Sequence, residues 1–268
     1  MQLLLERELI INKVKEGTIM FKAEIRADTL KSLVSVISTL IDEVKFTISP
    51  EGMTLKAVDP AHVAMIELNI EAGAFESYQA DQTEIGLDLD KVKDVLKLSS
   101  SAGDIISMEQ DEGYGRLIFR VGNITRRMNL VDTTSMNDPK VPQLELSANI
   151  EVSVLELQRG IKASENISDH IALTITPDYF ELACEGDTDS VNLKLDKSQL
   201  SNLDISGDMQ KYCSLFPLDY FSNLIKAVPS DANIRIELDN DYPVMLNFAL
   251  AEGKGSVKYL LAPRIESD

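Results

Sequence analysis

Two stretches of this chain repeat one pattern at widely separated positions. TISPEGMTLKA, residues 47 to 57, has the alternation and central turn residues of a β-hairpin, and TITPDYFELAC, residues 174 to 184, repeats them. Around the hairpins, residues 22 to 130 align with residues 149 to 260, and each half reads strand, helix, hairpin, strand, helix and then further strands. Because this spacing far exceeds the period of a solenoid, we expect two copies of one domain.

Periodicity inside each half predicts its elements. Apolar residues at helical spacing predict helices over residues 28 to 41, 90 to 98, 153 to 165 and 217 to 228, with Asp28 as the N-cap of the first. Near the C-terminus, two alternating runs on either side of AEGKG predict a hairpin with one buried face. One-sided helices and runs of antiparallel strands predict an α+β fold, with the helices on one side of the sheets.

The domain boundaries follow from a stretch without periodicity. Residues 132 to 149, DTTSMNDPKVPQLELSAN, are rich in Asp, Thr, Ser and Asn and contain two prolines, which is typical of a connector. We therefore expect domain 1 over residues 20 to 131, an interdomain connector over 132 to 149 and domain 2 over 150 to 268. Residues 1 to 19 belong to neither copy, and we interpret them as a loose extension or the product of an upstream start codon.

Composition narrows the class of protein. A chain of 268 residues with 44% hydrophobic residues is long enough for two ordinary domains with real cores. No apolar run approaches the roughly 18 residues of a membrane helix, and the only cysteines, Cys184 and Cys213, are typical of a reducing cytoplasm rather than a disulfide scaffold. The net charge of −18 predicts repulsion from nucleic acid unless the basic residues gather on one surface.

Motifs for catalysis and metal binding are missing from the sequence. The only histidines, His62 and His170, lie in no HExxH or His/Cys cluster, and the GxSxG, GxGxxG and P-loop patterns do not occur. The acidic runs EGDTDS and DNDYP lack the spacing of a calcium loop. We therefore expect no enzyme, no metal and no cofactor. An acidic hydrolase stays open as an alternative, because folding can bring carboxylates together from distant positions.

Four segments carry a likeness to a known family: FKAEIRADTLKSLVSVISTLIDE, AVDPAHVAMIEL, RRMNLVD and LLAPRIESD. They resemble the archaeal and eukaryotic DNA sliding clamps, the proliferating cell nuclear antigen family, and the likeness covers residues 20 to 268. The resemblance implies a ring of six similar domains, and hence a homotrimer of two-domain chains. In such a ring the helices face a central hole threaded by duplex DNA, and the sheets form the outer wall.

The resemblance implies a processivity factor for DNA polymerase. Its partners would be double-stranded DNA, bound without sequence preference, further copies of the same chain, a clamp loader, DNA polymerase, ligase and flap endonuclease, with no membrane partner. It would be cytoplasmic and associated with the nucleoid, or nuclear in a eukaryote. The alternatives are a specialised clamp paralogue that acts only in a heterotrimer and a scaffold that never meets DNA.

Matching to the family assigns channel-lining, DNA-binding roles to one set of basic residues. These are Lys31, Lys97, Lys162 and Lys226, and the predicted helices add Lys91, Lys93 and Arg159. The four helices hold seven basic against six acidic residues, although the whole chain is strongly acidic. Clamps often carry basic side chains where this chain has Ser38, Asp94, Asn166 and Asp219, which predicts weak DNA contact. Ordinary solvated helix faces are the alternative interpretation.

The resemblance implies two further sets of site residues. The subunit contact would join the strand near residues 125 to 131 to the strand near residues 190 to 195, with intersubunit ion pairs or merely exposed edge charges. Its residues are Arg126, Arg127, Met128, Asp187, Asp189, Val191 and Leu193. An apolar pocket would take client peptides that contain a glutamine, an aliphatic residue and two aromatic residues, unless LLAP only closes a core strand. The pocket residues are Val58, His62, Val63, Met136, Val141, Pro142, Pro243, Leu260, Leu261, Ala262 and Pro263.

Overall fold

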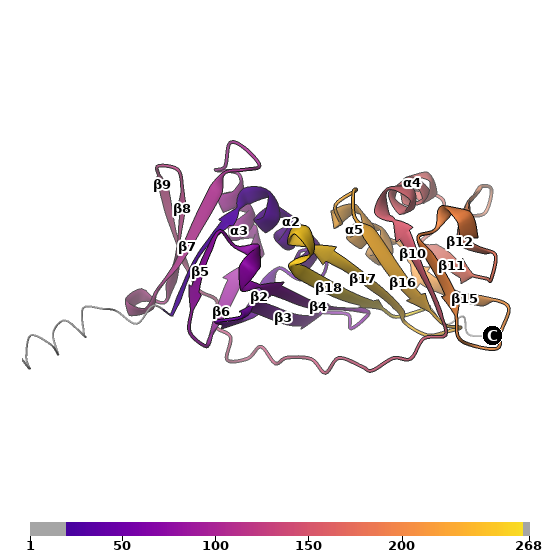
Figure 1. Ribbon diagram of the computed structural model, residues 1–268, viewed down its shortest axis with the longest axis horizontal. Helices are drawn as coiled ribbons and strands as arrows, with labels where there is room; N and C mark the ends of the chain where they lie inside the picture. Colours follow the sequence, from indigo (N-terminus) through magenta and orange to yellow (C-terminus); the bar gives the residue numbers. More distant parts are fainter. Residues whose placement is uncertain (1–19, 265–268) are drawn as a thin grey trace, which may run out of the picture.

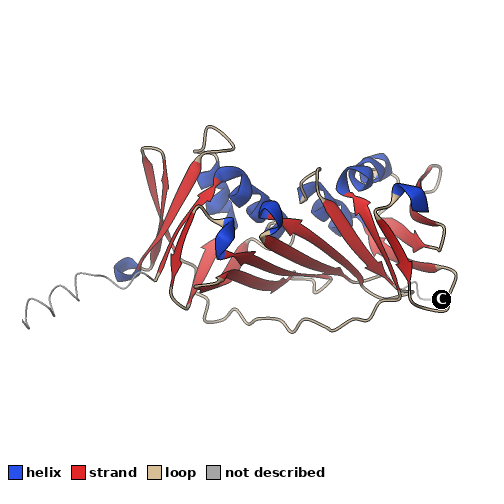
Figure 2. Cartoon of the chain, in the orientation of Figure 1, coloured by secondary structure: helices blue, strands red, loops and turns tan. Residues whose placement is uncertain are grey.

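The computed structural model describes residues 20 to 264 of the chain, so the expected N-terminal extension and the last four residues lie outside the described part. The molecule is elongated, and its α-helices lie toward one long side while strands form the other long side and both ends (Figures 1 and 2). The first half runs through β1 (Phe21–Arg26), α2 (Ala27–Ile37), β2 (Glu43–Ser49), β3 (Gly52–Val58), β4 (Ala64–Glu71), β5 (Ser77–Ala80), β6 (Thr83–Asp88), α3 (Leu89–Leu96), β7 (Ile105–Asp111), β8 (Arg116–Val121) and β9 (Ile124–Asn129).

The second half repeats this order after an extended connector. It runs through β10 (Ala148–Ser153), α4 (Val154–Ser164), β11 (His170–Ile175), β12 (Tyr179–Glu185), β13 (Ser190–Asp196), β14 (Asn202–Ile205), β15 (Tyr212–Pro217), α5 (Leu218–Ala227), β16 (Asn233–Leu238), β17 (Val244–Leu250) and β18 (Gly255–Leu261). The predicted duplication and α+β class are confirmed. Each half also contains two strands before its second helix that the sequence pattern did not predict separately: β5 and β6 in the first half, and β14 and β15 in the second.

The repeated hairpins form as predicted. In the first, Ser49 lies opposite Gly52, and in the second, Ile175 lies opposite Phe180. The four helices also form, with ends that differ from the prediction by a few residues. The largest difference is in α2, which ends at Ile37 because the next residues turn through short-range bonds, such as that from the N–H of Leu40 to the carbonyl of Ile37.

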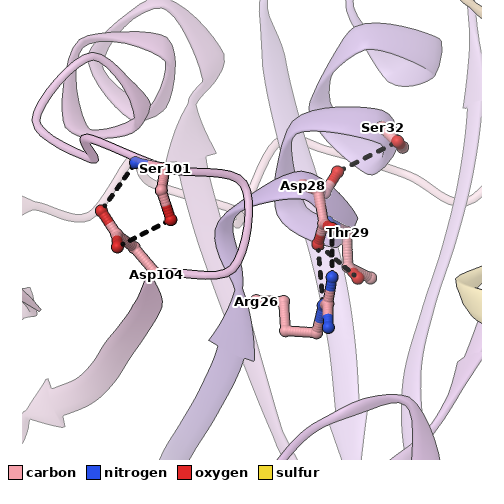
Figure 3. A network of polar contacts seen from close by, with 6 residues as sticks. All are labelled: Arg26, Asp28, Thr29, Ser32, Ser101 and Asp104. Atoms are coloured by element: carbon pink, nitrogen blue, oxygen red, sulfur yellow. Dashed lines mark hydrogen bonds and ion pairs between the residues drawn. The ribbon is translucent and has the colours of Figure 1, made fainter.

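The prediction that Asp28 is the N-cap of the first helix is wrong. The N-cap is Arg26, whose side chain makes no capping bond, and Asp28 lies in the first turn, where it accepts bonds from the Arg26 guanidinium and the Thr29 backbone N–H (Figure 3). The carbonyls of Ala102 and Asp104 cap the helix instead, accepting from the first backbone N–H groups. The loop before β7 therefore fixes the start of α2.

The strands of the described residues form three antiparallel sheets, and one of them crosses the boundary between the halves. A five-stranded sheet has the order β5-β1-β7-β8-β9, and a four-stranded sheet has the order β13-β12-β11-β15. Between them, a nine-stranded sheet has the order β14-β10-β16-β17-β18-β4-β3-β2-β6. Five of its strands come from the second half and four from the first, and the two sets meet where β18 pairs with β4 along their whole lengths. Backbone pairing thus holds the two halves together.

Each helix buries one stripe against the sheets. In α2 the buried stripe contains Leu30, Leu33, Val34 and Ile37, and comparable apolar stripes hold α3, α4 and α5. The opposite side of each helix is left to solvent, and all four helices lie toward the same long side of the molecule (Figure 2). Within residues 20 to 264, no helix combines the length and apolar character needed to cross a membrane.

Candidate DNA-facing and partner-binding surfaces

The helices bring basic residues from both halves of the chain to one surface. Helix α2 contacts α3 within the first half and α5 across the boundary between the halves. A shallow groove of about 810 Å³ follows this contact. Its basic lining residues are Lys31 from α2, Lys93 and Lys97 from α3 and its C-cap, and Lys226 from α5. Residues far apart in the sequence therefore form one basic surface, although the net charge of the chain is −18.

The remaining three predicted DNA contacts lie beside this groove or away from it. Arg159 and Lys162 project from α4, which packs against α5 and is tied to it by Gln158, whose amide donates to the carbonyls of Ile225 and Val228. Lys91 lies in the first turn of α3 and pairs with the N-cap residue Asp88 at 2.7 Å, outside the groove lining.

Acidic side chains of the same helices neutralise several of these basic residues. Lys93 pairs with Asp90 at 2.9 Å, Lys97 with Asp94 at 2.8 Å, and Arg159 with Glu156 at 3.1 Å, each three residues earlier. Lys226 reaches from α5 to Glu165 at 2.7 Å. Within the described part of the chain, Lys31 and Lys162 make no ion pair. Basic side chains therefore gather on this surface, but their ion pairs leave it only a weak positive electrostatic potential.

Asp94 also connects this surface to the edge of the five-stranded sheet. Its second oxygen lies 3.4 Å from the guanidinium of Arg126 on β9. The hydrogen bond with Lys97 is the main cause that lowers the pKa of Asp94, and Arg126 adds to it. Asp94 is therefore charged at neutral pH and shared between a groove lysine and an edge arginine.

Two further departures from the family pattern lie together. Asn166 and Asp219 line a depression of about 390 Å³ with Glu165 and Lys226. Lys226 lowers the pKa of Glu165 through their hydrogen bond, so this carboxyl is not the raised acid that a hydrolase would use. Among residues 20 to 264, no three His, Cys, Asp or Glu side chains cluster as metal ligands would.

An apolar groove of about 370 Å³ lies at the junction of the halves, on the side where the connector runs (Figure 1). Seven of the predicted pocket residues line it: Val58, His62, Val63, Pro142, Pro243, Leu260 and Ala262. Four other residues also line it and were not predicted: Ala64, Met65, Pro139 and Lys140. Met65 could have been inferred from strand pairing, because it lies opposite both Val58 and Leu260.

The structure places four predicted pocket residues outside this lining. Leu261 has no exposed surface, because side chains alternate along β18 and its side chain points into the core with that of Tyr259. Met136 and Val141 are half-buried in the connector, and Pro263 follows the end of β18. Leu261 is therefore a core residue, and the backbone beside it forms the groove.

A buried carboxylate shapes one wall of the groove. Asp59 is 3% exposed and accepts hydrogen bonds from the backbone N–H groups of Ala61, Val63 and Ala64, at 3.0, 2.7 and 2.7 Å. The hydroxyl of Tyr220, on α5 of the other half, donates to Asp59 at 2.7 Å. Burial acts to raise the pKa of Asp59, but these hydrogen bonds lower it overall. Asp59 thus holds the loop that carries His62 and ties it to the second half.

The predicted subunit-contact strands are the free edges of the two outer sheets. Strand β9 ends the five-stranded sheet and β13 ends the four-stranded sheet. They lie toward opposite ends of the molecule, as the positions of β9 and of the β11 to β12 hairpin show (Figure 1). Met128 is 4% exposed and packs into its own core, so only its backbone is available at the edge. Leu193 is half-buried against Gly160 of α4.

The charged edge residues form no ion pair with one another within the chain. Arg126 pairs with Asp94, while Arg127 and the acidic residues Asp187 and Asp189 make no ion pair among the described residues. Arg126 and Arg127 lie on β9, whereas Asp187 and Asp189 lie in the loop before β13 of another sheet, so any pairing between them would need a second copy.

The internal junction shows how such edges can join. Strand β18 has the position in the second half that β9 has in the first, because each is the last strand of a five-stranded set. Strand β4 has the position in the first half that β13 has in the second, because each follows the repeated hairpin. Since β18 and β4 pair antiparallel within the chain, β9 and β13 are the corresponding pair that has no partner strand among residues 20 to 264.

Comparison with known proteins gives a consistent result. Residues 20–138 match the family model described as proliferating cell nuclear antigen, N-terminal domain, and residues 140–264 match that of the C-terminal domain. The DNA polymerase sliding clamps of Methanosarcina mazei and Methanococcoides burtonii are 41% and 42% identical over 250 residues, covering 93% of this chain and 100% of each relative.

Solved structures give the same fold. A structure of A. fulgidus PCNA bound to the C-terminal region of FEN-1 superposes with a TM-score of 0.85 at 29% identity, covering 93% of this chain and 100% of that one. PCNA from Thermococcus kodakaraensis superposes with a TM-score of 0.83 at 25% identity, covering 91% of this chain and 100% of that one.

Proposed function

Because the chain belongs to the proliferating cell nuclear antigen family and is a DNA sliding clamp, a processivity factor for DNA polymerase, we propose that three copies close into a ring around duplex DNA. Each copy contributes domain 1 (residues 20 to 131), the connector (132 to 149) and domain 2 (from residue 150). Closure alone keeps the ring on DNA, so the helix surface needs no tight contact.

The observation that supports the ring is the β18 to β4 junction. Applied between copies, this junction pairs β9 of one chain with β13 of the next and extends the outer sheet around the whole ring. A head-to-tail contact of this kind closes only when the rotation per copy divides the circle. Two similar domains per chain make the contacts inside and between chains alike, which favours a ring of six domains from three chains.

The internal junction also predicts a register. Leu260 lies opposite Met65 in the β18 to β4 pair, and the aligned repeats place Arg127 and Ser190 at these positions. In the ring, Arg127 of one copy would therefore lie opposite Ser190 of its neighbour. Asp189 directly precedes Ser190, which gives Arg127 an acidic group to approach. Asp187, which also precedes β13, remains a candidate for Arg126.

Oligomeric mass and cross-linking test the ring. In moderate salt, light scattering of the pure chain should give about three times the chain mass of 29.7 kDa, whereas a monomer would favour the heterotrimeric paralogue. Directly opposed strand residues have Cα atoms about 4.5 to 5.5 Å apart, which suits a disulfide. The pair Arg127→Cys and Ser190→Cys should therefore oxidise to a covalent ring. The pair Arg127→Cys and Lys197→Cys, beyond the end of β13, is the control, and equal cross-linking of both pairs would contradict the register.

The basic helix surface would line the hole of this ring. We assign phosphate contact to the groove residues Lys31, Lys93, Lys97 and Lys226 and to Arg159 and Lys162 on α4. Lys91, which was also expected to contact DNA, lies outside the groove. Lysines on exposed helix faces contact phosphates without reading the bases, which permits sliding. The ring should stay on closed circular DNA and leave after linearisation. Equal loss from both DNAs would support the scaffold alternative.

The apolar groove would bind client peptides, each with a glutamine, an aliphatic residue and two aromatic residues. Its aliphatic walls suit buried aromatic anchors, and the complex of the A. fulgidus relative with the C-terminal region of FEN-1 supports a flap endonuclease as one client. DNA polymerase, ligase and a clamp loader are further proposed clients. Ala262→Glu, at the groove, should abolish peptide binding, while its effect on the trimer should be small because Ala262 is half-buried and follows the end of β18.

We further propose that the chain has no catalytic activity and works at the nucleoid, where its clients act on DNA. The proposed role requires only a topological tether and a docking groove. An acidic hydrolase is not favoured, because the family is non-catalytic and the Glu165 carboxyl has a lowered pKa. Measurable hydrolysis of phosphodiester or peptide substrates by the pure trimer, lost on Glu165→Gln, would overturn this part of the proposal.

A further inference from the structure

A nearly buried lysine lies beneath the interdomain connector. Lys45 is in β2 between the buried residues Val44 and Phe46, so its side chain points away from the core, yet it is only 12% exposed. Lysines are rarely covered to this extent unless they are paired. The ammonium nitrogen of Lys45 lies 2.8 Å from a carboxylate oxygen of Asp138 in the connector and 3.6 Å from one of Glu84 on β6.

The first residues of the connector are guided to this lysine. The backbone N–H of Val131 donates to the carbonyl of Gly86, which is the residue opposite Lys45 in the β2 to β6 pair. A Cβ atom on Gly86 would lie 2.2 Å from the carbonyl oxygen of Val131, so only glycine permits this approach. The hydroxyl of Thr133 then donates to Glu84 at 3.5 Å. The connector therefore follows the edge of the nine-stranded sheet until Asp138 meets Lys45.

Beyond Asp138 the connector is poorly anchored. Within the described part of the chain, no hydrogen bond or ion pair holds residues 139 to 146, and the next anchor is Ser147, whose hydroxyl donates to Asp239 at 2.7 Å. Pro139, Lys140 and Pro142 form a wall of the apolar groove and lie in this unanchored run. The pair of Lys45 and Asp138 is thus the last fixed point before the wall.

The electrostatics of this contact keep it formed at neutral pH. The hydrogen bond with Asp138 is the main cause that raises the pKa of Lys45, with a further contribution from Glu84, while burial acts in the opposite direction. The acidic partners are about half exposed and the lysine is not, so screening by solvent is incomplete.

We propose that Lys45 is a positioning residue for the client-peptide groove, because its ion pair with Asp138 fixes the connector wall formed by Pro139, Lys140 and Pro142. This inference rests on the proposed function of that groove. Without the ion pair the wall samples more conformations, and a peptide must then restrict them when it binds, which weakens its affinity. Lys45 itself lies outside the groove lining and need not touch the peptide.

The test uses the full chain and a fluorescein-labelled synthetic peptide with a glutamine, an aliphatic residue and two adjacent aromatic residues. Lys45→Met keeps the length of the side chain and removes its charge, and it should weaken binding about threefold to tenfold, the usual range for one partly covered ion pair. Asp138→Asn should do the same, and the double variant should be no weaker than either single one. Lys45→Arg should restore binding.

Two further measurements separate positioning from general loss of structure. Lys56→Met is the matched control, because Lys56 on β3 pairs with Glu67 on the neighbouring strand β4, away from the connector. Tryptic cleavage after Lys140 should accelerate in Lys45→Met and Asp138→Asn but not in the control, while the midpoint of thermal unfolding stays close to that of the parent chain.

The outcomes distinguish this inference from the proposed function. If the parent chain does not bind the peptide, the groove assignment fails and the positioning role fails with it. If the parent chain binds, but Lys45→Met binds equally well and is cleaved after Lys140 at the parent rate, the groove stands and the role of Lys45 is overturned. An equal loss of affinity in Lys56→Met would also overturn it.

Discussion

The hydroxyl of Tyr220 should stabilise the junction between the two halves by a measurable amount. It is the only bond among the described residues that joins α5 to the buried carboxylate of Asp59, and its length is 2.7 Å. A hydrogen bond to a charged acceptor contributes roughly 1.5 to 3 kcal/mol. Tyr220 is partly exposed, so water would replace part of the lost bond in Tyr220→Phe. We therefore expect the free energy of unfolding to fall by about 1 to 2 kcal/mol.

Urea unfolding followed by circular dichroism, at one fixed protein concentration, measures this change. The concentration must be fixed because assembly of copies raises apparent stability. Tyr242→Phe is the matched control, since Tyr242 is 55% exposed and its hydroxyl makes no hydrogen bond within the described residues. If the midpoints of the two variants agree within error, the Asp59 to Tyr220 bond does not stabilise the junction and the reasoning is refuted.

Three further predictions concern pH, DNA and the connector. Because the pKa of Asp59 is lowered on folding, its stabilising contribution is complete above its unfolded pKa of about 4 and is lost as the pH falls through the folded value. Asp59→Asn should therefore reduce the loss of unfolding free energy below about pH 4, compared with the control Asp81→Asn. Asp94→Asn should release Lys97 and steepen the salt dependence of duplex binding, and an unchanged slope would show that Lys97 does not meet phosphate. Gly86→Ala should lower the urea midpoint through its clash with Val131, whereas Gly103→Ala, which has open space, should not.

Much of the fold could be predicted from the local sequence. The repeated hairpin, the apolar stripes of the four helices and the alternation in β17 and β18 are short-range patterns, because a helix or strand must bury one face wherever it packs. The N-cap of α2 could not be predicted in this way. Asp28 is a residue type that often caps helices, but in this structure backbone carbonyls of the loop that ends at Asp104 accept hydrogen bonds from the first N–H groups of α2.

For the candidate surfaces too, sequence predicts individual residues, whereas the fold decides which of them lie together. Lys31 and Lys226 could be named from sequence, but their common groove exists only because α2 meets α5 across the junction. The family resemblance implies a pocket role for Leu261, whereas the pleat of β18 turns its side chain into the core.

The sequence by itself determined two similar α+β domains, an acidic surface and a chain segment suited to link them, because these depend on neighbouring residues and on composition. Only the tertiary structure decided which residues meet across distance: Asp59 with Tyr220, Lys45 with Asp138, and β18 with β4. Such contacts join positions far apart in the chain, and no local pattern records which of many polar side chains will lie opposite one another. The edges left free at β9 and β13 follow from that pairing, and with them the expected ring.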